Sequence, residues 1–475
     1  MTFADQITIL NGMSHSKLIT KKELSPDQKK GLAEMLTFMR DNSEREMVLT
    51  GAAGTGKTSL LHVFLKELSK EFKKIKVYCT AYTNEAVRVL SQRTGKNYDK
   101  TISGLLGLKL EQNEDKGKIL VRDGACHASK YRLIVIDEAS MVNDECYEMI
   151  QSVLRDFPQM KILYVGDEAQ LPPVNFASSV VFSRIPHIFR LTKVMRVSAD
   201  NPIIDLVTPI RDPRNMFQVH DCFEHVDRLN ERGEGVRFYT AKKPFFDNLF
   251  ADFMSEEYKE NKNFCRLLAY TNNAVDKSNI FIRRHIFGND VEEYTVGDDL
   301  IVTEGYSIPL AGGKTLQVYA NGERLAVREA EKYTEQETNI VCWSLLVDNY
   351  MAPSNKRELR HIKVLSTAEG YPTYMAVKRA LIGKARTLCA EIDPMTGKPV
   401  HNRHDVWQEY YDFIDSFCYV NYSYAMTIHK AQGSTIDNVY AVEKDINICD
   451  WDVVQRNKLK YTAFTRAAKN LHILN

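Results

Sequence analysis

The sequence lacks a charge excess, closely spaced cysteine pairs and long apolar runs. Its 63 Lys and Arg nearly balance 62 Asp and Glu, for a net charge of +1, so any polyanion must be held by local basic patches. The nine cysteines include no C-x-x-C pair, which disfavours a structural zinc site or a disulfide scaffold and favours reduced thiols in a cytoplasm. No apolar stretch approaches the roughly 18 residues of a membrane helix, and the N-terminus lacks a signal-peptide pattern. We therefore expect a cytoplasmic protein without a membrane partner.

The length and the ordinary composition predict a protein of several folded parts. With 475 residues, 44% hydrophobic and 26% charged, the chain has the composition of a globular protein. This length suggests roughly three or four compact units.

The clearest chemical signal is a phosphate-binding loop of the pattern G-x-x-x-x-G-K-[ST]. It consists of Gly51, Ala52, Ala53, Gly54, Thr55, Gly56, Lys57 and Thr58. Residues 47–50 read as a buried strand and 59–65 as a helix, the context that this motif requires. Backbone N–H groups and the helix N-terminus would bind a polyphosphate. We expect Lys57 to reach the β- and γ-phosphates and Thr58 to bring a hydroxyl to Mg²⁺.

Two carboxylates and a glutamine follow predicted central strands. The apolar residues 133–136 precede Asp137 and Glu138, and a strand that is apolar on both faces is typical of a parallel sheet. Asp137 is placed to hold Mg²⁺ and Glu138 to polarise the water that attacks the γ-phosphate. A second such strand, 161–166, precedes Gln170, which we expect to sense the γ-phosphate. Without these neighbouring motifs, each would be an ordinary loop side chain.

Three more residues are candidates because of their positions. Gln28 lies in the first turn of a helix predicted from Pro26 to about Arg40, and its amide can pair with an adenine edge. Arg196 follows a short apolar segment, from which it could reach a phosphate. Arg466 is expected in the lobe opposite the phosphate loop, where an arginine stabilises transition-state charge. Taken alone, each is more often a solvated surface side chain.

The order of predicted elements indicates an α/β protein with two similar halves. Residues 266–275 repeat the strand, polar turn and helix of 77–90, and ligands commonly bind in a cleft between two such lobes. A predicted hairpin, for which an ordinary surface loop is an equal alternative, interrupts the first half, and short strands form a small β-barrel-like insertion in the second. The predicted domains are 1–105 with 128–180, the hairpin 106–127, 181–295 with 416–475, and the insertion 296–415.

Part of this insertion has a composition that suits nucleic acid. Residues 351–405 carry ten Lys and Arg against five Asp and Glu, with Tyr371 and Tyr374 among them. Basic residues mixed with aromatics are typical of single-strand binding. For any one of these residues, a solvated charged face is the better explanation.

In this order, the motifs resemble those of superfamily-one helicases, in the 5′-to-3′ branch that contains RecD-like and Dda-like proteins. The resemblance runs from Gln28 to Arg466. The segments that resemble the Q motif and motifs I, Ia, II, III, IV, V and VI are Gln28, 51–58, 81–90, 135–140, 165–174, Arg196, 427–435 and 461–467. Leu171-Pro172-Pro173 and Lys430-Ala431-Gln432-Gly433 follow this branch rather than the branch of opposite polarity.

The resemblance implies two RecA-like lobes that bind ATP and Mg²⁺, with a strand-separating hairpin in the first and an SH3-like domain in the second. It makes Arg466 the arginine finger and adds Gln432 and Gly433 to the nucleotide site. It also implies DNA contacts from Thr83, Asn84, Thr101, Thr271, Asn272, Thr427 and His429. The hairpin has no aromatic residue between Leu108 and Val121, so a stacking wedge at its tip is not expected.

The predicted activity is that of an ATP-dependent DNA helicase that translocates 5′ to 3′ on single-stranded DNA and acts at junctions with duplex. We expect a monomer serving phage-type replication, recombination or repair, in the host cytoplasm if phage-encoded, with single-strand-binding or replisome proteins as candidate partners. Two alternatives remain open. The protein could be an RNA helicase, because the ATP motifs do not read the sugar, or an ATP-gated single-strand-binding module that does not unwind.

Overall fold

The structure is a computed structural model in which the chain forms two compact units. It describes all residues except 1–20, 95–97, 99, 114–116, 123–125, 174–175, 177, 194–199, 213, 219–221, 311–313, 353–356, 393 and 396–399. The first unit comprises Met1–Arg237, Gln432–Ser434 and Cys449–Lys469. The second comprises Phe238–Ala431, Thr435–Ile448 and Asn470–Asn475.

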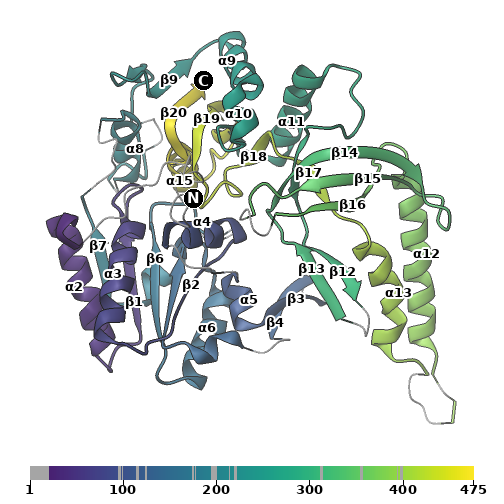
Figure 1. The fold of residues 1–475 in the computed structure, drawn as a ribbon, viewed down its shortest axis with the longest axis horizontal. Coiled ribbons are helices and arrows are strands. Elements are labelled where there is room, and N and C mark those ends of the chain that lie inside the picture. Colours follow the sequence, from purple (N-terminus) through teal and green to yellow (C-terminus); the bar gives the residue numbers. More distant parts are fainter. Residues whose placement is uncertain are drawn as a thin grey trace, which may run out of the picture. The chain divides into compact units, whose positions relative to one another are not determined.

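The first unit is built on a five-stranded parallel sheet with the order β2-β5-β6-β1-β7 (Figure 1). Its strands are β1 (Glu46–Gly51), β2 (Val77–Ala81), β5 (Leu133–Asp137), β6 (Lys161–Gly166) and β7 (Ile188–Leu191). Strands β1, β5 and β6 are almost completely buried, which explains why they read as continuous apolar runs. Parallel strands end at one edge of the sheet, where the predicted phosphate loop and carboxylates lie.

The first unit also contains helices. They are α2 (Pro26–Arg40), α3 (Lys57–Glu71), α4 (Asn84–Thr94), α5 (Ile102–Leu106), α6 (Asp144–Asp156), α7 (Val181–Arg184), α8 (Ile203–Arg211) and α15 (Val453–Phe464), with 3-10 turns η1 (Lys21–Glu23), η2 (His127–Lys130) and η3 (Ala139–Met141). The helix predicted from Pro26 to Arg40 is confirmed. It starts with a capping box in which Ser25 and Gln28 exchange side-chain and backbone hydrogen bonds.

The predicted hairpin is confirmed in the first unit. Strands β3 (Leu108–Asn113) and β4 (Gly117–Arg122) pair antiparallel from Leu108↔Arg122 to Asn113↔Gly117. Residues 114–116 of its tip lie outside the described part of the chain.

A second α/β sheet has six strands in the order β18-β10-β19-β20-β9-β8. Its members are β8 (Arg228–Leu229), β9 (Gly235–Tyr239), β10 (Cys265–Ala269), β18 (Ala425–Thr427), β19 (Ile436–Val442) and β20 (Ala467–Leu474). Strand β10 runs parallel to both of its neighbours. The helices nearest to these strands in sequence are α9 (Lys242–Met254), α10 (Glu256–Glu260), α11 (Asn272–Phe287) and α14 (Glu443–Ile446). The predicted α/β class is therefore confirmed.

The second unit also contains the predicted β-rich insertion. A five-stranded antiparallel sheet has the order β16-β15-β14-β11-β17, and β12 pairs with β13. The strands are β11 (Asp299–Val302), β12 (Tyr306–Leu310), β13 (Lys314–Tyr319), β14 (Arg324–Thr334), β15 (Val341–Asp348), β16 (Leu359–Leu365) and β17 (Val420–Tyr422).

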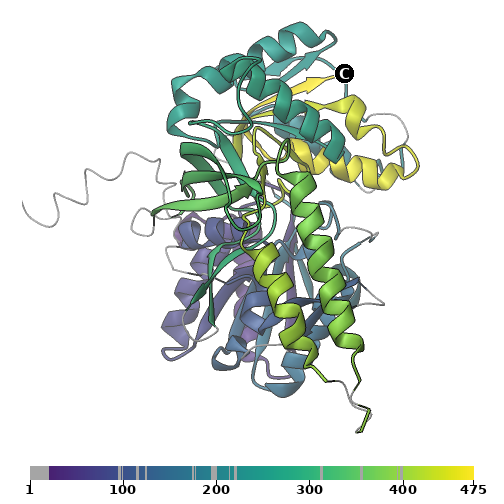
Figure 2. The same cartoon turned by 90° about the vertical axis from the view of Figure 1, so that its right-hand side faces the viewer.

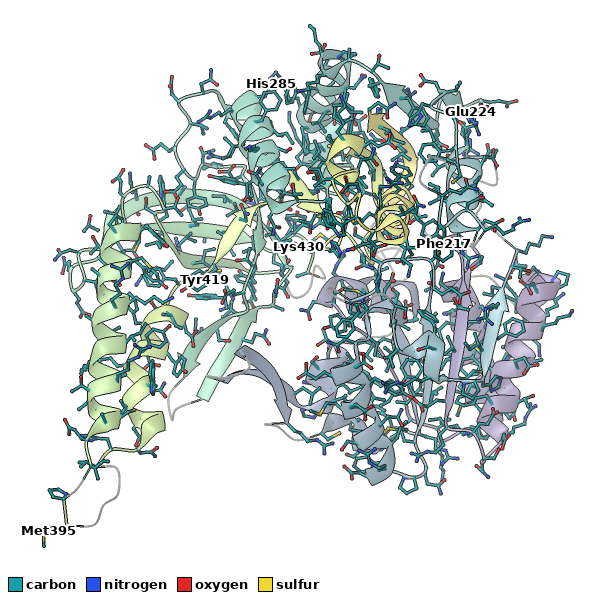
Figure 3. All side chains as sticks on the ribbon, turned by 180° about the vertical axis from the view of Figure 1, so that it is seen from behind. Phe217, Glu224, His285, Met395, Tyr419 and Lys430 are labelled. Atoms are coloured by element: carbon teal, nitrogen blue, oxygen red, sulfur yellow. The ribbon has the colours of Figure 1, made fainter. Side chains whose placement is uncertain are left out.

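Two long helices, α12 (Tyr371–Ala390) and α13 (Arg403–Asp415), lie side by side beyond this sheet (Figures 1 and 2). Tyr374, Phe413 and Phe417 pack their rings between them. Figure 3 shows Met395 at the far end of the pair, where its side chain is 94% exposed. No helix in the described part of the chain is long and apolar enough to cross a membrane.

Buried charges join the antiparallel sheet to the α/β sheet within the second unit. Arg266 of β10 and Asp299 of β11 are both fully buried, with Nη1 and Oδ2 2.9 Å apart. Arg283 of α11 pairs with Asp298 at 2.7 Å. Removing one partner of such a pair leaves a buried charge uncompensated, which costs about 3–5 kcal/mol. The insertion is thus anchored to its host sheet.

Two predicted domain boundaries are wrong. The boundary at residue 180 comes too early, because β7 returns to the first sheet and pairs with β1. The segment 416–475 is not one piece of the second domain, because Cys449–Lys469 groups with the first unit. The reason is that α15 makes its polar contacts with loops of the first sheet, which no local pattern reveals.

Candidate active site

The phosphate loop connects β1 to α3 in the first unit. Gly54 and Gly56 have φ angles of 82° and 78°, in the left-handed region that favours glycine. A Cβ on Gly56 would lie 2.5 Å from Nε2 of Gln28. The conformation therefore favours glycine at this position, and any Cβ would also displace the amide of Gln28.

Lys57 is held inside the loop. Its Nζ donates hydrogen bonds to the carbonyl oxygens of Gly51 at 2.7 Å and Ala52 at 3.1 Å. Burial lowers the pKa of the ammonium below its ordinary value, and the nearby carboxylates of Asp167, Glu138 and others act in the opposite direction. A cation at the N-terminus of α3, beside the loop's backbone N–H groups, fits a polyphosphate.

Gln28 links α2 to the loop. Its Oε1 accepts a hydrogen bond from Ser25 N at 3.0 Å, and its Nε2 donates to Thr55 O at 3.1 Å. The side chain is buried. The predicted adenine contact stays a prediction, and the structure assigns Gln28 a further task of supporting the loop.

The two carboxylates lie where β5 ends. Asp137 Oδ1 accepts a hydrogen bond from Glu138 N at 2.9 Å. Glu138 itself has φ 53° and ψ 45°, a left-handed conformation that costs a non-glycine residue about 1–3 kcal/mol and persists where the surroundings impose it, often at functional sites.

The residues predicted to hold Mg²⁺ have suitable donor atoms. Thr58 lies in the first turn of α3 and Asp137 at the end of β5. A hydroxyl and a carboxylate are the hard oxygen ligands that Mg²⁺ combines with water and substrate phosphates.

A hydrogen-bonded relay, which we call the Tyr461 relay, connects the loop to β6 and α8. Ala53 N donates to Tyr461 Oη at 3.3 Å, and Tyr461 donates to Asp167 Oδ2 at 2.6 Å. Arg211 Nε donates to Asp167 Oδ1 at 3.4 Å. Asp167 is fully buried, so these donors stabilise a carboxylate that water does not reach.

The loop after β6 is also held by the segments that resemble motifs V and VI. Gln432 Nε2 donates to Leu171 O at 3.1 Å, and Leu171 N donates to Thr462 Oγ1 at 3.1 Å. Gln170, the predicted sensor, is buried, and its Oε1 has no hydrogen-bond partner among the described residues. Gly433 has φ 78°. Gln432 therefore supports the sensor loop, and its predicted nucleotide contact is untested.

Arg466 is buried beside α15. Its guanidinium donates to Thr462 O at 3.2 Å, to Ser434 O at 3.4 Å and to Thr465 Oγ1 at 3.3 Å. It groups with the phosphate loop in the first unit and directly precedes β20 of the second sheet, and its predicted role from the opposite lobe stays a prediction. Arg196, the other predicted arginine, lies outside the described residues.

The predicted DNA-contacting residues of the first unit stand at helix starts. Thr83 Oγ1 accepts a hydrogen bond from Ala86 N at 3.2 Å, and Asn84 is the first residue of α4. Thr101 is the N-cap of α5 and accepts from Gly104 N. The two threonine hydroxyls thus cap helices.

Those of the second unit gather at the carboxyl ends of β10 and β18, which are parallel neighbours. Thr271 caps α11 and donates to Asp445 Oδ1 at 2.7 Å, whereas Asn272 is exposed. Thr427 Oγ1 accepts from Lys430 N. Burial lowers the pKa of His429, which favours its neutral form.

Sequence reasoning missed Asp167, Tyr461 and Arg211 as site residues. Asp167 and Tyr461 lie within the segments that resemble motifs III and VI, so those motifs were the available signal. Arg211 lies at the end of α8, outside every motif, and no local pattern marks it.

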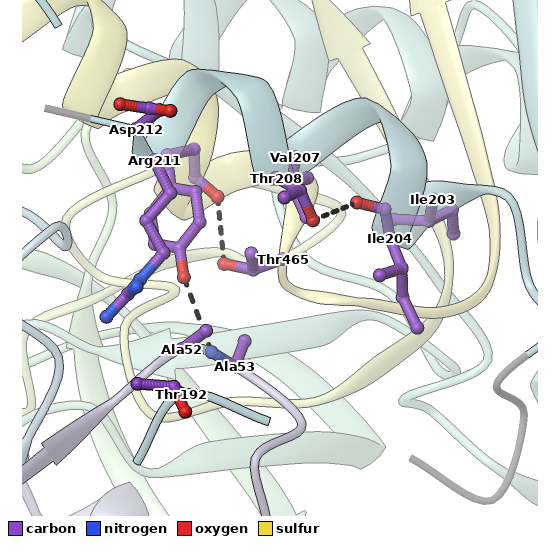
Figure 4. Close-up of a pocket in the computed structure, with 11 residues that line it drawn as sticks. Ala52, Ala53, Thr192, Ile203, Ile204, Val207, Thr208, Arg211, Asp212 and Thr465 are labelled. Carbon is purple, nitrogen blue, oxygen red and sulfur yellow. Dashed lines mark hydrogen bonds between the residues drawn. The ribbon is translucent and has the colours of Figure 1, made fainter. Parts of the chain in front are cut away.

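A pocket of about 300 Å³ opens beside the phosphate loop (Figure 4). Apolar side chains of α8 form one side, and the loop's two alanines form another. The lining residues are Ala52, Ala53, Thr192, Ile203, Ile204, Val207, Thr208, Arg211, Asp212, Tyr461 and Thr465. The pocket and the Tyr461 relay share Ala53, Arg211 and Tyr461.

Two family models match the chain. Residues 38–176 match an AAA domain, and residues 422–474 match the UvrD-like helicase C-terminal domain. The first match includes the phosphate loop and both carboxylates. The second includes Gln432, Tyr461 and Arg466.

Individual proteins are similar over nearly the whole chain or over part of it. The ATP-dependent DNA helicase dda of Enterobacteria phage T4 is 26% identical over 473 residues, covering 94% of this chain and 98% of its own. The ATP-dependent DNA helicase Pif1 of Bdellovibrio bacteriovorus is 22% identical over 484 residues, covering 95% and 88%. The RecD2 DNA helicase of Deinococcus radiodurans is 31% identical over 179 residues, covering 37% and 23%.

Among solved structures, the Pif1 helicase from Candida albicans aligns with a TM-score of 0.48 and 17% identity, covering 95% of this chain and 94% of that chain. The family models and the near-full-length similarity to the dda and Pif1 helicases agree with the order of the motifs. The chain is thus similar to superfamily-one helicases of the Dda-like and RecD-like branch.

Proposed function

We propose that the protein is an ATP-dependent DNA helicase that translocates 5′ to 3′ along single-stranded DNA and separates duplex at a junction. The observation that carries this proposal is the Tyr461 relay, which joins the phosphate loop to the segments resembling motifs III and VI. A phosphate loop alone would serve a kinase or a transporter motor equally well. The names of the full-length homologues support the same activity.

In the proposed reaction, the loop N–H groups and Lys57 bind the triphosphate, and Glu138 orients the attacking water and accepts its proton. Thr58 and Asp137 would hold Mg²⁺, which when bound neutralises phosphate charge. Gln170 lies in the loop after β6, from which we expect it to sense the γ-phosphate. Arg466 would stabilise the charge that develops during phosphoryl transfer.

We further propose that the two α/β sheets form RecA-like lobes and that the five-stranded antiparallel sheet is an SH3-like domain. Thr83, Asn84 and Thr101 in the first unit, with Asn272 and His429 in the second, would contact DNA. These residues stand at carboxyl ends of strands or starts of helices, where open α/β sheets bind ligands.

The test is a strand-displacement assay on partial duplexes that carry either a 5′ or a 3′ single-stranded tail. The proposal expects displacement that needs ATP and a 5′ tail, and none by Lys57→Ala. Exclusive use of the 3′ tail would overturn the direction. DNA-stimulated hydrolysis without displacement would instead favour the ATP-gated binding module.

The choice between DNA and RNA needs its own measurement. We expect oligo(dT) to stimulate ATP hydrolysis more strongly than oligo(U) in a competition assay, because the similar proteins are named DNA helicases. Preference for RNA would support the RNA helicase alternative.

A further inference from the structure

The pocket beside the phosphate loop contains one arginine that no motif assigns. Arg211 ends α8 and lines the pocket together with Ala52 and Ala53 of the loop. Figure 4 shows its side chain extending from α8 toward the side of the pocket where Ala52 and Thr192 lie. A guanidinium thus faces the backbone that is expected to bind phosphates.

Arg211 is held in this orientation by buried groups. Its Nε pairs with Oδ1 of Asp167 at 3.4 Å, and the arginine side chain is 28% exposed while the aspartate is fully buried. Asp167 is fixed in turn by Tyr461 at 2.6 Å and by Ala169 N at 3.2 Å. With Nε engaged, the guanidinium is oriented before any ligand arrives, which reduces the entropy lost on binding.

The other charged groups near the pocket already have hydrogen-bond or ion-pair partners. Asp212 lines the pocket, but its carboxylate is paired with Arg214, whose side chain is 86% exposed. Arg466 donates to backbone carbonyls and Thr465. Lys57 donates to carbonyls within the loop. Among the residues that line the pocket, Arg211 is the arginine that a phosphate can meet.

We propose that Arg211 binds the terminal phosphate of a nucleoside triphosphate held by the loop, and that Asp167 and Tyr461 are its positioning residues. The planar guanidinium offers paired donors that match phosphate oxygens. This inference rests on the proposed function, and it adds a contact that distinguishes triphosphate from diphosphate. Tyr461 also bonds Ala53 N, so the same phenol aligns the loop and, through Asp167, the arginine.

The test compares the affinities of Arg211→Ala and wild type for a fluorescent non-hydrolysable triphosphate analogue and for the matching diphosphate. A charge-assisted hydrogen bond to phosphate predicts triphosphate binding weaker by about tenfold or more, with diphosphate binding changed less than about threefold. Equal weakening of both would overturn the proposal, because Arg211 would then act only as a counter-ion that shapes the loop. No change in either affinity would overturn it as well.

Two further variants make the result specific. Arg214→Ala removes an exposed arginine three residues away and should leave both affinities as in wild type. Arg211→Lys keeps a charge near Asp167 and should retain part of the triphosphate preference, so it replaces Arg211→Ala if thermal melting shows that variant to be unfolded. If Arg211→Lys then keeps the full preference, or loses affinity for both nucleotides equally, the proposal is wrong.

The same titration separates this inference from the proposed function. Wild type that binds neither nucleotide, or Lys57→Ala that binds both normally, would contradict the nucleotide site itself. If wild type binds both nucleotides normally and Arg211→Ala changes the two affinities equally or not at all, only the proposed role of Arg211 is contradicted.

Discussion

Glu138 combines a chemical role with an unfavourable backbone conformation. Its left-handed φ of 53° places the residue directly after Asp137 at the end of a buried strand. A glutamate has no steric reason to adopt this conformation, so the surrounding β5–η3 turn must impose it.

Glu138→Gln should bind ATP with nearly unchanged affinity and fail to turn it over, because an amide accepts no proton from water. Nucleotide titration and steady-state hydrolysis measured on the same preparation check this. Turnover within a few-fold of wild type would show that another residue serves as the base.

Arg466 could act in catalysis or only in structure, because its guanidinium contacts backbone carbonyls and a threonine. Arg466→Ala should reduce the rate of hydrolysis about 10³-fold or more, by analogy with arginine fingers. Single-turnover kinetics at saturating ATP measure the chemical step. An unchanged rate with lowered melting temperature would indicate that these contacts are structural only.

The burial of helix α15 explains why its place in the candidate active site could not be predicted from the sequence. Nine consecutive residues, 456–464, are buried although Lys458 and Lys460 are among them. A helix buried on all sides has no polar face, so its periodicity does not identify its neighbours. Its contacts with the loop after β6 arise only in the folded chain.

The turn between β13 and β14 contains a carboxyl group that makes stability depend on pH. Burial raises the pKa of Glu323 from 4.5 to about 7, opposed by hydrogen bonds that include one from Asn349. The unfolded chain loses this proton first, so the folded state loses stability as pH rises from about 4.5 to about 7 and then stays constant. Below that window the group contributes nothing.

Glu323→Gln should therefore raise the urea midpoint relative to wild type at pH 8 and leave it unchanged at pH 4.5. Glu329→Gln, an exposed position on β14, serves as the control and should shift neither value. A stabilisation of equal size at both pH values would contradict ionisation as the cause.

The residues expected to bind ATP and the hairpin expected to separate DNA strands belong to different elements of the fold. The hairpin of β3 and β4 leaves the parallel sheet after α5 and forms its own antiparallel pair. Its strands contain none of the residues assigned to nucleotide binding.

Replacing residues 110–120 with a short glycine linker should abolish displacement of a duplex. DNA-stimulated hydrolysis should stay within about twofold of wild type, because the hairpin contains none of the residues assigned to nucleotide binding. Parallel displacement and hydrolysis assays check this. Retained displacement would mean that another element separates the strands. The hairpin strands contain no aromatic residue that could stack on a base, so this outcome has a physical reason.

The α/β class, the phosphate loop, the carboxylates after β5, the hairpin and the β-rich character of the insertion could be predicted from the amino-acid sequence alone. This was possible because each depends on short-range chemistry: glycines for left-handed turns, apolar runs for buried strands and capping residues for helix starts. The helix from Pro26 to Arg40 is the clearest instance.

Tertiary structure alone decided how distant segments combine. Strand β7 belongs to the first sheet, and Tyr461 lies 408 residues from Ala53, to which it is hydrogen-bonded. Arg211 became a site residue only because α8 folds beside the loop, and Gln28 acquired a supporting role through Thr55. Such contacts follow from long-range packing and buried polar pairing, which leave no periodic trace in the chain around either partner.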